Sequence, residues 1–168
     1  TWPIDHDDGS CYYYDTYNFL VYGGYKNYLG HTKIVKYNFY VYPDAAHSFD
    51  NNLGAFFSKP FCAVSNGAST GTLPSGWGEV WSNNSCVIGN PNIYAFGSCN
   101  PSNPLKGIVP LTANNQFYAP NKDIYIKCGS KQFSLAEYQR MGYDIGSTVN
   151  DPMDTESIIA SGKKILGL

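Results

Sequence analysis

The residues best suited to chemistry form an acidic cluster near the start of the sequence, Asp5-His6-Asp7-Asp8. Carboxylates beside a sugar bond can act as acid, base or nucleophile, so Asp5, Asp7 and Asp8 are candidate catalytic residues. The cluster could also bind a divalent cation, calcium through oxygens or zinc or copper through His6, with Asp5 and Asp7 as further weak candidate ligands. The alternative is an ordinary turn, because Asp side chains bond backbone amides and Gly9 supplies positive φ. We expect no other cofactor.

Two polar residues near a glycine pair extend this candidate site. Lys26 follows Gly23-Gly24, and His31 could donate a proton because histidine titrates near neutral pH. A phosphate-binding interpretation of the glycine pair fails, because no P-loop or dinucleotide pattern surrounds it. The sequence also lacks the G-x-S-x-G elbow of serine hydrolases. We predict Lys26 and His31 as catalytic residues at the floor of a groove, with a solvated surface lysine as the alternative for Lys26.

Tyrosine is concentrated in the same part of the chain. The sequence contains 15 tyrosines, and most of them lie between residues 12 and 42. Exposed aromatic rings offer faces on which sugar rings can stack, although tyrosine is also a common strand residue. Side chains alternate between the two faces of a strand, so the run 12–14 must send at least one ring outward. We predict three substrate-binding residues in a tyrosine-lined groove: Tyr14, Tyr25 and Tyr28.

Internal repeats indicate the elements that position these residues. Segment 17–22 recurs as 37–42, and asparagine pairs recur at 51–52, 83–84 and 114–115. Segment 92–97 aligns with 123–128, at the same 31-residue step as the last two asparagine pairs. Steps near 20 residues, lengthened by loops, are typical of a solenoid in which stacked asparagines bond backbone groups at the turns. The repeats predict an all-β fold, a right-handed parallel β-helix, with a β-sandwich as the alternative.

The end of the sequence changes from strand to helix patterns. Ser134 and Glu137 form a capping box, and Asp154 can cap a second helix from Thr155 to about Leu166. We expect these short C-terminal helices to cover the last strands, because a solenoid must protect its open edge. The second helix should bury one apolar stripe, made of Ile158, Ile159, Ile165 and Leu166. The predicted organisation is a single domain, with parallel β-helix strands and loops 65–78 and 99–110 in residues 1–132, and a helical cap in residues 133–168.

Composition limits the partners and the compartment. Charged residues make up only 14% and the net charge is −2, so a basic surface for nucleic acid is absent. No apolar run is long enough to span a membrane. Five cysteines without a C-x-x-C pair favour disulfides, and Asn83-Asn84-Ser85 is a glycosylation acceptor at Asn83. We therefore predict a secreted glycoprotein in which Cys11 is the odd cysteine, either free or bonded to a disulfide-linked or processed partner chain.

Three segments together resemble right-handed β-helix proteins related to bacterial glycoside hydrolases. The segments are Asp5 to Ser10, Gly23-Gly24-Tyr25-Lys26, and Gly142 to Ser147. The resemblance covers the C-terminal strands and tail of that family, and it implies a β-helix that acts on polysaccharide.

The resemblance also implies a catalytic pair, of which one member is missing here. In the family, a carboxylate from the Asp-rich turn and a glutamate in a Gly-Gly-x-Lys-x-x-Glu-Gly stretch face the sugar. The glycines and Lys26 match this stretch, but Leu29 occupies the glutamate position. Glycoside hydrolysis usually needs two carboxylates. Glu79 is one other candidate, and His31 could serve as proton donor.

The sequence therefore leaves two functional hypotheses. The first is a secreted β-helix protein that acts on or binds carbohydrate, as a glycosidase or lyase of polysaccharides. The alternative is a catalytically inactive glycan-binding protein, which Leu29 favours, or a structural extracellular matrix or assembly protein, in which the spare cysteine would serve assembly. The enzyme and the glycan-binding protein would have a glycan partner, the assembly protein would have a disulfide-linked one, and none of them is expected to bind nucleic acid or a membrane.

Overall fold

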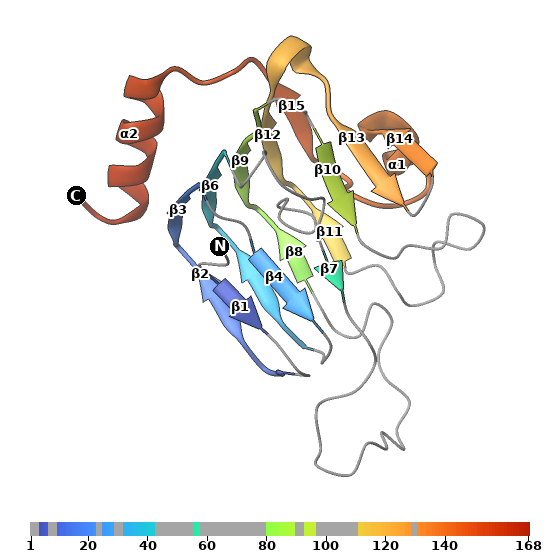
Figure 1. Cartoon of the computed structure of the whole chain (residues 1–168), viewed down its shortest axis with the longest axis horizontal. Coiled ribbons are helices and arrows are strands. Elements are labelled where there is room, and N and C mark those ends of the chain that lie inside the picture. Colours follow the sequence, from blue (N-terminus) through green and yellow to red (C-terminus); the bar gives the residue numbers. More distant parts are fainter. Residues whose placement is uncertain are drawn as a thin grey trace.

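Short parallel strands dominate the computed structural model (Figure 1). The structure describes residues 4–6, 10–22, 25–28, 32–42, 56–57, 80–89, 93–96, 111–128 and 131–168. The strands are β1 (Ile4–His6), β2 (Tyr14–Thr16), β3 (Phe19–Val21), β4 (Tyr25–Tyr28), β5 (Ile34–Lys36), β6 (Phe39–Val41), β7 (Phe56–Phe57), β8 (Val80–Ser82), β9 (Ser85–Val87), β10 (Ile93–Phe96), β11 (Leu111–Ala113), β12 (Gln116–Tyr118), β13 (Tyr125–Cys128), β14 (Lys131–Ser134) and β15 (Thr148–Asn150). The helices are α1 (Leu135–Arg140), α2 (Thr155–Ile165) and the 3-10 turn η3 (Pro120–Lys122).

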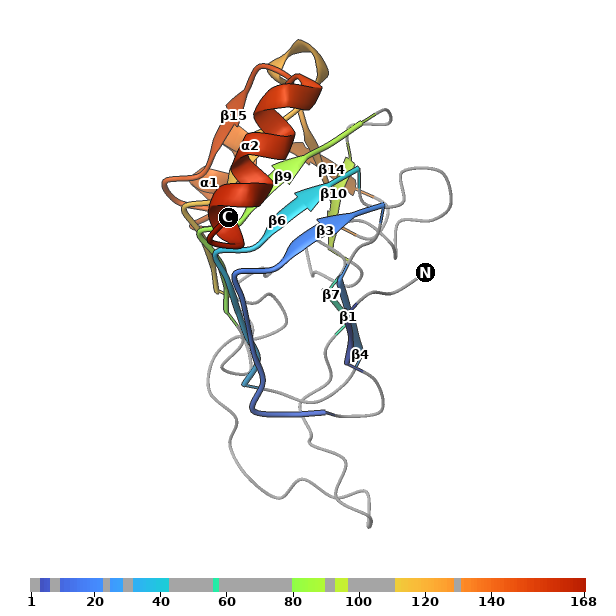
Figure 2. The same ribbon diagram turned by 90° about the vertical axis from the view of Figure 1, so that its left-hand side faces the viewer.

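The strands form four sheets. A four-stranded sheet has the order β11-β8-β5-β2 and a five-stranded sheet has the order β15-β12-β9-β6-β3, with every pair parallel. A third sheet, β1-β4-β7, is also parallel, and β10-β13-β14 ends in an antiparallel strand. Figure 2 shows β3, β6 and β9 rising together beside α2, apart from β1, β4 and β7.

The predicted all-β, right-handed parallel β-helix is wrong. Separate parallel sheets of four and five strands combine with two α-helices, which is an α/β arrangement, and the described residues show no right-handed β-helix. The physical reason is that equal sequence steps fix only the register of parallel neighbours. They specify neither a continuous coil nor its handedness. The predicted loops 65–78 and 99–110 lie outside the described residues.

The repeats do predict strand register, with one error. Phe19 pairs with Phe39, as the 20-residue step requires. Ile93, however, pairs with Tyr125 rather than with Ile124, so the step here is one residue longer than the alignment predicted. The extra residue enters before β13, where Asn121 adopts a φ of 58° in η3. A one-residue slip exchanges the faces of a strand, so this turn decides which β13 side chains are buried.

The core lies between the sheets and is strongly aromatic. Tyr40, Trp81 and Phe117 are almost fully buried, and the rings of Tyr40 and Trp81 stack with centroids 5.3 Å apart. Tyr40, Cys86 and Phe117 occupy matching register positions on β6, β9 and β12. Burial of such side chains contributes on the order of 2 kcal/mol each and holds the sheets together.

Both predicted helices are present, but the buried stripe on α2 differs from the prediction. Ser134 and Glu137 form the capping box of α1, and the Asp154 side chain accepts a hydrogen bond from Ser157 N at the start of α2. Ile158 and Gly162 are buried on α2, whereas Ile159 and Leu166 are about half exposed. The buried spacing therefore follows positions i and i+4, which share one helix face.

Helix α2 covers the outer face of the five-stranded sheet. Ile158 belongs to an apolar cluster with Phe39, Val41 and Val87. A Cβ atom on Gly162 would lie 2.6 Å from the ring of Phe19, so glycine allows this close approach. The sheet edge beside β12 is occupied by the strand β15, not by a helix. Within the described residues, no helix is both long and apolar enough to cross a membrane.

Candidate functional site

A two-residue corner joins each strand of the four-stranded sheet to the next strand of the five-stranded sheet. The corners are 17–18, 37–38, 83–84 and 114–115, and Gly146-Ser147 occupies the matching position before β15. The second corner residue is buried at Asn38, Asn84 and Asn115, whereas the first is exposed in the two tyrosine corners and at Asn114 and half-buried at Asn83. Each corner therefore has a structural and a surface position.

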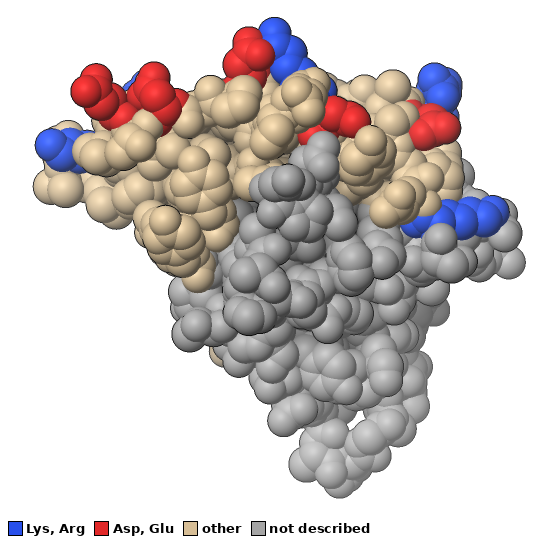
Figure 3. Space-filling model, turned by 45° about the horizontal axis from the view of Figure 1, so that its top comes forward, with Lys and Arg blue, Asp and Glu red and all other residues tan. Residues whose placement is uncertain are grey.

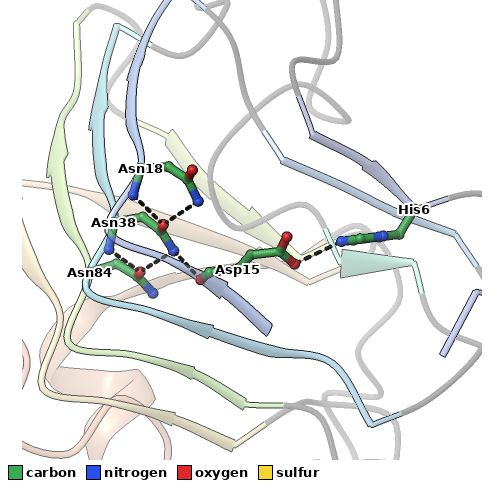
Figure 4. Close-up of polar contacts among 5 residues, drawn as sticks. All are labelled: His6, Asp15, Asn18, Asn38 and Asn84. Atoms are coloured by element: carbon green, nitrogen blue, oxygen red, sulfur yellow. Dashed lines mark hydrogen bonds and ion pairs between the residues drawn. The ribbon is translucent and has the colours of Figure 1, made fainter. Parts of the chain in front are cut away.

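An asparagine ladder fills the inner corner positions (Figure 4). Asn18 donates through both its backbone N and Nδ2 to Asn38 Oδ1, at 3.0 and 2.9 Å. Asn38 donates in the same way to Asn84 Oδ1, and Asn84 N donates to Asn115 Oδ1. The ladder ends where Asn115 Nδ2 donates to Asp144 Oδ1 at 2.9 Å. These bonds satisfy backbone groups that would otherwise be buried unpaired, which confirms the predicted role of stacked asparagines.

The outer corner positions share one unusual backbone conformation. Tyr17, Tyr37, Asn83 and Asn114 have φ values of 58°, 59°, 55° and 55°, and Gly146 has 77°. Asparagine and glycine tolerate this left-handed region, whereas a bulky residue there is an outlier that costs on the order of 1–2 kcal/mol. Tyrosine at the first two corners is thus unfavourable for the backbone alone.

Further tyrosines repeat this conformation every five residues. Tyr12, Tyr17 and Tyr22 have φ values of 63°, 58° and 57°, and Tyr37 and Tyr42 have values of 59° and 47°. Aligned rings stack in columns: Tyr17 on Tyr37 with centroids 5.3 Å apart and planes 13° apart, and Tyr22 on Tyr42 at 6.1 Å. The five-residue spacing of tyrosine is visible in the sequence and is the signal that could have identified these positions.

We define the tyrosine face as five rings that remain well exposed. The exposed fractions are 69% for Tyr12, 75% for Tyr14, 59% for Tyr17, 73% for Tyr22 and 44% for Tyr37. The predicted outward ring in the run 12–14 is confirmed, and all three tyrosines there are exposed. Within the tyrosine face the rings of Tyr17 and Tyr37 are stacked at one corner, and exposed aromatic side chains of this kind are typical of binding surfaces.

A histidine on β1 and a carboxylate on β2 lie close together beneath the tyrosine run 12–14 (Figure 4). His6 Nε2 lies 2.7 Å from Asp15 Oδ2, and the His6 ring packs on Tyr13 with centroids 4.1 Å apart. Burial, followed by the nearby charge of Asp15, raises the pKa of Tyr40 well above its usual range. The Tyr40 hydroxyl makes no hydrogen bond within the described part of the chain. This pair contains one carboxylate, which does not supply the two roles of glycoside hydrolysis.

The predicted catalytic residues are only partly located. Parallel register of β1 and β4 pairs Asp5 with Lys26, so the structure brings these two positions side by side. The predicted ligand-binding Tyr25 and Tyr28 lie at the ends of β4. The other predictions fall outside the described residues: Asp7, Asp8, Leu29, His31 and Glu79.

The metal and cysteine predictions have different outcomes. Among the residues that the structure describes, no three His, Cys, Asp or Glu side chains group to hold a metal ion, and His6 is hydrogen-bonded to Asp15. Cys86 is free and buried, whereas Cys11 is disulfide-bonded, so the prediction that Cys11 is the odd cysteine is wrong. Burial raises the pKa of the Cys86 thiol well above its usual range, which keeps it protonated and unreactive.

Charge is sparse around the tyrosine face. In segments 10–22 and 32–42 the charged residues are Asp15, which bonds His6, the buried Lys33 and the half-buried Lys36. In Figure 3 the charged side chains of that view gather along one margin of the described surface. Among the described residues of these two segments, the tyrosine face is therefore aromatic with few charged neighbours.

Comparison with known proteins finds no matching family model, no matching curated protein and no matching solved structure. The resemblance to β-helix glycoside hydrolases gains no support from these comparisons.

Proposed function

We propose that this protein binds carbohydrate, and that the tyrosine face is its binding surface. The observation that carries the proposal is the placement of exposed tyrosines at positive φ, where asparagine occupies the equivalent corners of the later strands. A pyranose ring presents an apolar C–H face that packs on an aromatic ring, while its hydroxyls bond the phenol oxygen or water.

Backbone strain supports a role for these side chains beyond folding. Asn83 and Asn114 show that the corner forms without an aromatic ring. Offset stacking of Tyr17 on Tyr37 returns on the order of 1 kcal/mol, which offsets only part of the cost of two left-handed tyrosines. Strained residues that contribute no net stability are typical of functional positions.

The charge distribution favours a neutral glycan. An acidic polysaccharide would need exposed lysine or arginine at the tyrosine face, and the described segments there contain one buried and one half-buried lysine. The His6–Asp15 pair is almost enclosed and the His6 ring packs on Tyr13, so we assign this pair a structural role rather than a catalytic one. We therefore favour a glycan-binding protein over a hydrolase.

Secretion is part of the proposal, and a glycan at Asn83 would support it. Asn83 is half-buried at its corner, and its Nδ2 lies 3.3 Å from Ser82 Oγ, a long contact that attachment of a sugar would replace. The intact mass of the native protein, before and after enzymatic removal of N-glycans, tests this point.

The binding proposal is tested with soluble neutral polysaccharides, among them a β-glucan, a mannan and a xylan, in affinity gel electrophoresis. The native protein should be retarded by at least one of them and not by an acidic polysaccharide such as alginate. The variant Tyr17→Asn/Tyr37→Asn should migrate freely, while Tyr125→Asn, which removes an exposed ring on β13, should behave as the native protein. Unretarded native protein across the whole panel would refute the proposal.

A further inference from the structure

The outer face of the five-stranded sheet changes from apolar to polar along the strand order. One register column runs Phe19, Phe39, Ser85, Gln116 and Thr148, and a second runs Val21, Val41, Val87, Tyr118 and Asn150. Helix α2 packs on the apolar part through Ile158 and Gly162. The polar side chains on β12 and β15 lie beyond this packed region.

An apolar hollow lies between α2 and the outer face of the five-stranded sheet. Its volume is about 440 Å³, and its walls include Phe39, Tyr118, Met153 and Ile165, with Ser161 on the helix side. This volume falls in the range of roughly 300–1,000 Å³ that is typical of small-molecule sites. Lys164 also lines the hollow, but it sits in the last turn of α2, where a cation complements the helix dipole.

A polar hollow of about 510 Å³ adjoins the first and shares Tyr118 and Met153 with it. Gln116, Thr148 and Asn150 line it. Gln116 accepts a hydrogen bond from the Tyr118 hydroxyl at 2.8 Å, which leaves its amide nitrogen available as a donor. Asn150 donates to Thr148 Oγ1 and to Phe117 O, so its amide oxygen is available as an acceptor.

The acidic residues of the polar hollow are already engaged. Asp151 forms an ion pair with Lys122 at 2.8 Å, and Asp154 accepts from Ser157 N at 2.7 Å as the cap of α2. The remaining lining groups are neutral donors and acceptors. They suit hydroxyl groups better than a charged headgroup.

We propose that the two hollows form one site for an amphiphilic glycoside, with the apolar tail beneath α2 and the neutral sugar on β12 and β15. Tyr118 and Met153 mark the boundary between the two parts. The site is distinct from the tyrosine face, with which it shares only Tyr17, and it adds a lipid-linked or aryl-linked sugar to the ligands of this protein.

The test uses octyl β-glucoside below its critical micelle concentration as the probe, with glucose and octanol as separate half-ligands, in isothermal titration calorimetry. The native protein should bind octyl glucoside at one site about tenfold more tightly than either half-ligand. Ser161→Phe should fill the apolar hollow and weaken octyl glucoside binding about tenfold, and Ser161→Leu provides a smaller filling variant that perturbs α2 less. Gln116→Ala/Asn150→Ala should remove the advantage over octanol and leave octanol binding unchanged.

Gln132→Ala, at an exposed glutamine on β14, should bind as the native protein. Equal affinities for octanol and octyl glucoside in the native protein would overturn the assignment of the polar hollow. Unchanged binding in both folded Ser161 variants would overturn the assignment of the apolar hollow. Neither result depends on polysaccharide binding at the tyrosine face, so the two proposals fail separately.

Discussion

The first two corners and the next two have the same backbone and different side chains. Tyr17 and Tyr37 have the φ values of Asn83 and Asn114 to within a few degrees, and the inner asparagine follows each of them. Asparagine is the residue expected in this conformation, so the later corners show what folding requires. The tyrosines show what folding does not require, and that difference supports our proposal that the early corners bind the ligand.

The largest expected effect on stability comes from breaking the asparagine ladder, which the early and the later corners share. Asn84→Ala removes the acceptor of Asn38 N and the donor to Val35 O, and both groups are buried. Two unsatisfied buried groups should lower the free energy of unfolding by about 3 kcal/mol. Urea denaturation measures this loss, and Asn83→Gly in the same corner should change the midpoint little. A loss equal to that of Asn83→Gly would mean that the ladder does not stabilise the fold.

The close packing of α2 on the apolar part of the five-stranded sheet gives the next largest expected effect on stability. Gly162→Ala would place a Cβ atom 2.6 Å from the Phe19 ring, which is held against Phe39 with centroids 5.5 Å apart. We expect a destabilisation of about 2 kcal/mol, despite the better helix propensity of alanine. Thermal unfolding checks this value against Ser161→Ala, which should be nearly neutral. A stabilised Gly162→Ala would show that α2 packs loosely on the sheet.

The buried thiol of Cys86 should make the free energy of unfolding depend on pH. The folded-state pKa of Cys86 is raised by burial above its ordinary value of 9.0. The associated stability is therefore complete below pH 9 and is lost as pH rises further, because the unfolded chain ionises first. The slope should approach about 1.4 kcal/mol per pH unit above pH 9, before the tyrosines contribute. In Cys86→Ala the free energy of unfolding should stay flat between pH 9 and 10, and an unchanged slope would contradict the assignment.

Exchanging the corner residues should have the smallest effect on stability. Tyr37→Asn removes the Tyr17–Tyr37 stack and relieves the left-handed tyrosine, so we expect a change within about 0.5 kcal/mol. Asn83→Tyr should cost about 1 kcal/mol, because it imposes the strain without a completed binding surface. Chemical denaturation of both variants measures the two changes in the free energy of unfolding. A large loss in Tyr37→Asn would show that the ring is structural.

Sequence patterns predicted what repeats locally and failed where the geometry is not local. The 20-residue repeat of Tyr17-Asn18-Phe19 gave strand register, and Ser134 with Glu137 gave a helix start. The fold class was wrong, because equal spacing does not encode how parallel sheets connect. The His6–Asp15 contact was missed because nine residues and two sheets separate the partners. The positive φ of the tyrosines was missed because a single tyrosine does not predict it, although the five-residue spacing of tyrosine was visible in the sequence.

The central claim is that tyrosine at the early corners serves glycan binding and not folding. The direct measurement is calorimetric titration of Tyr17→Asn/Tyr37→Asn with the polysaccharide that retards the native protein, together with the urea midpoint of the same sample. We predict an affinity loss of about tenfold or more with an unchanged midpoint. Native affinity in the double variant, or a midpoint that falls together with affinity, would contradict the claim.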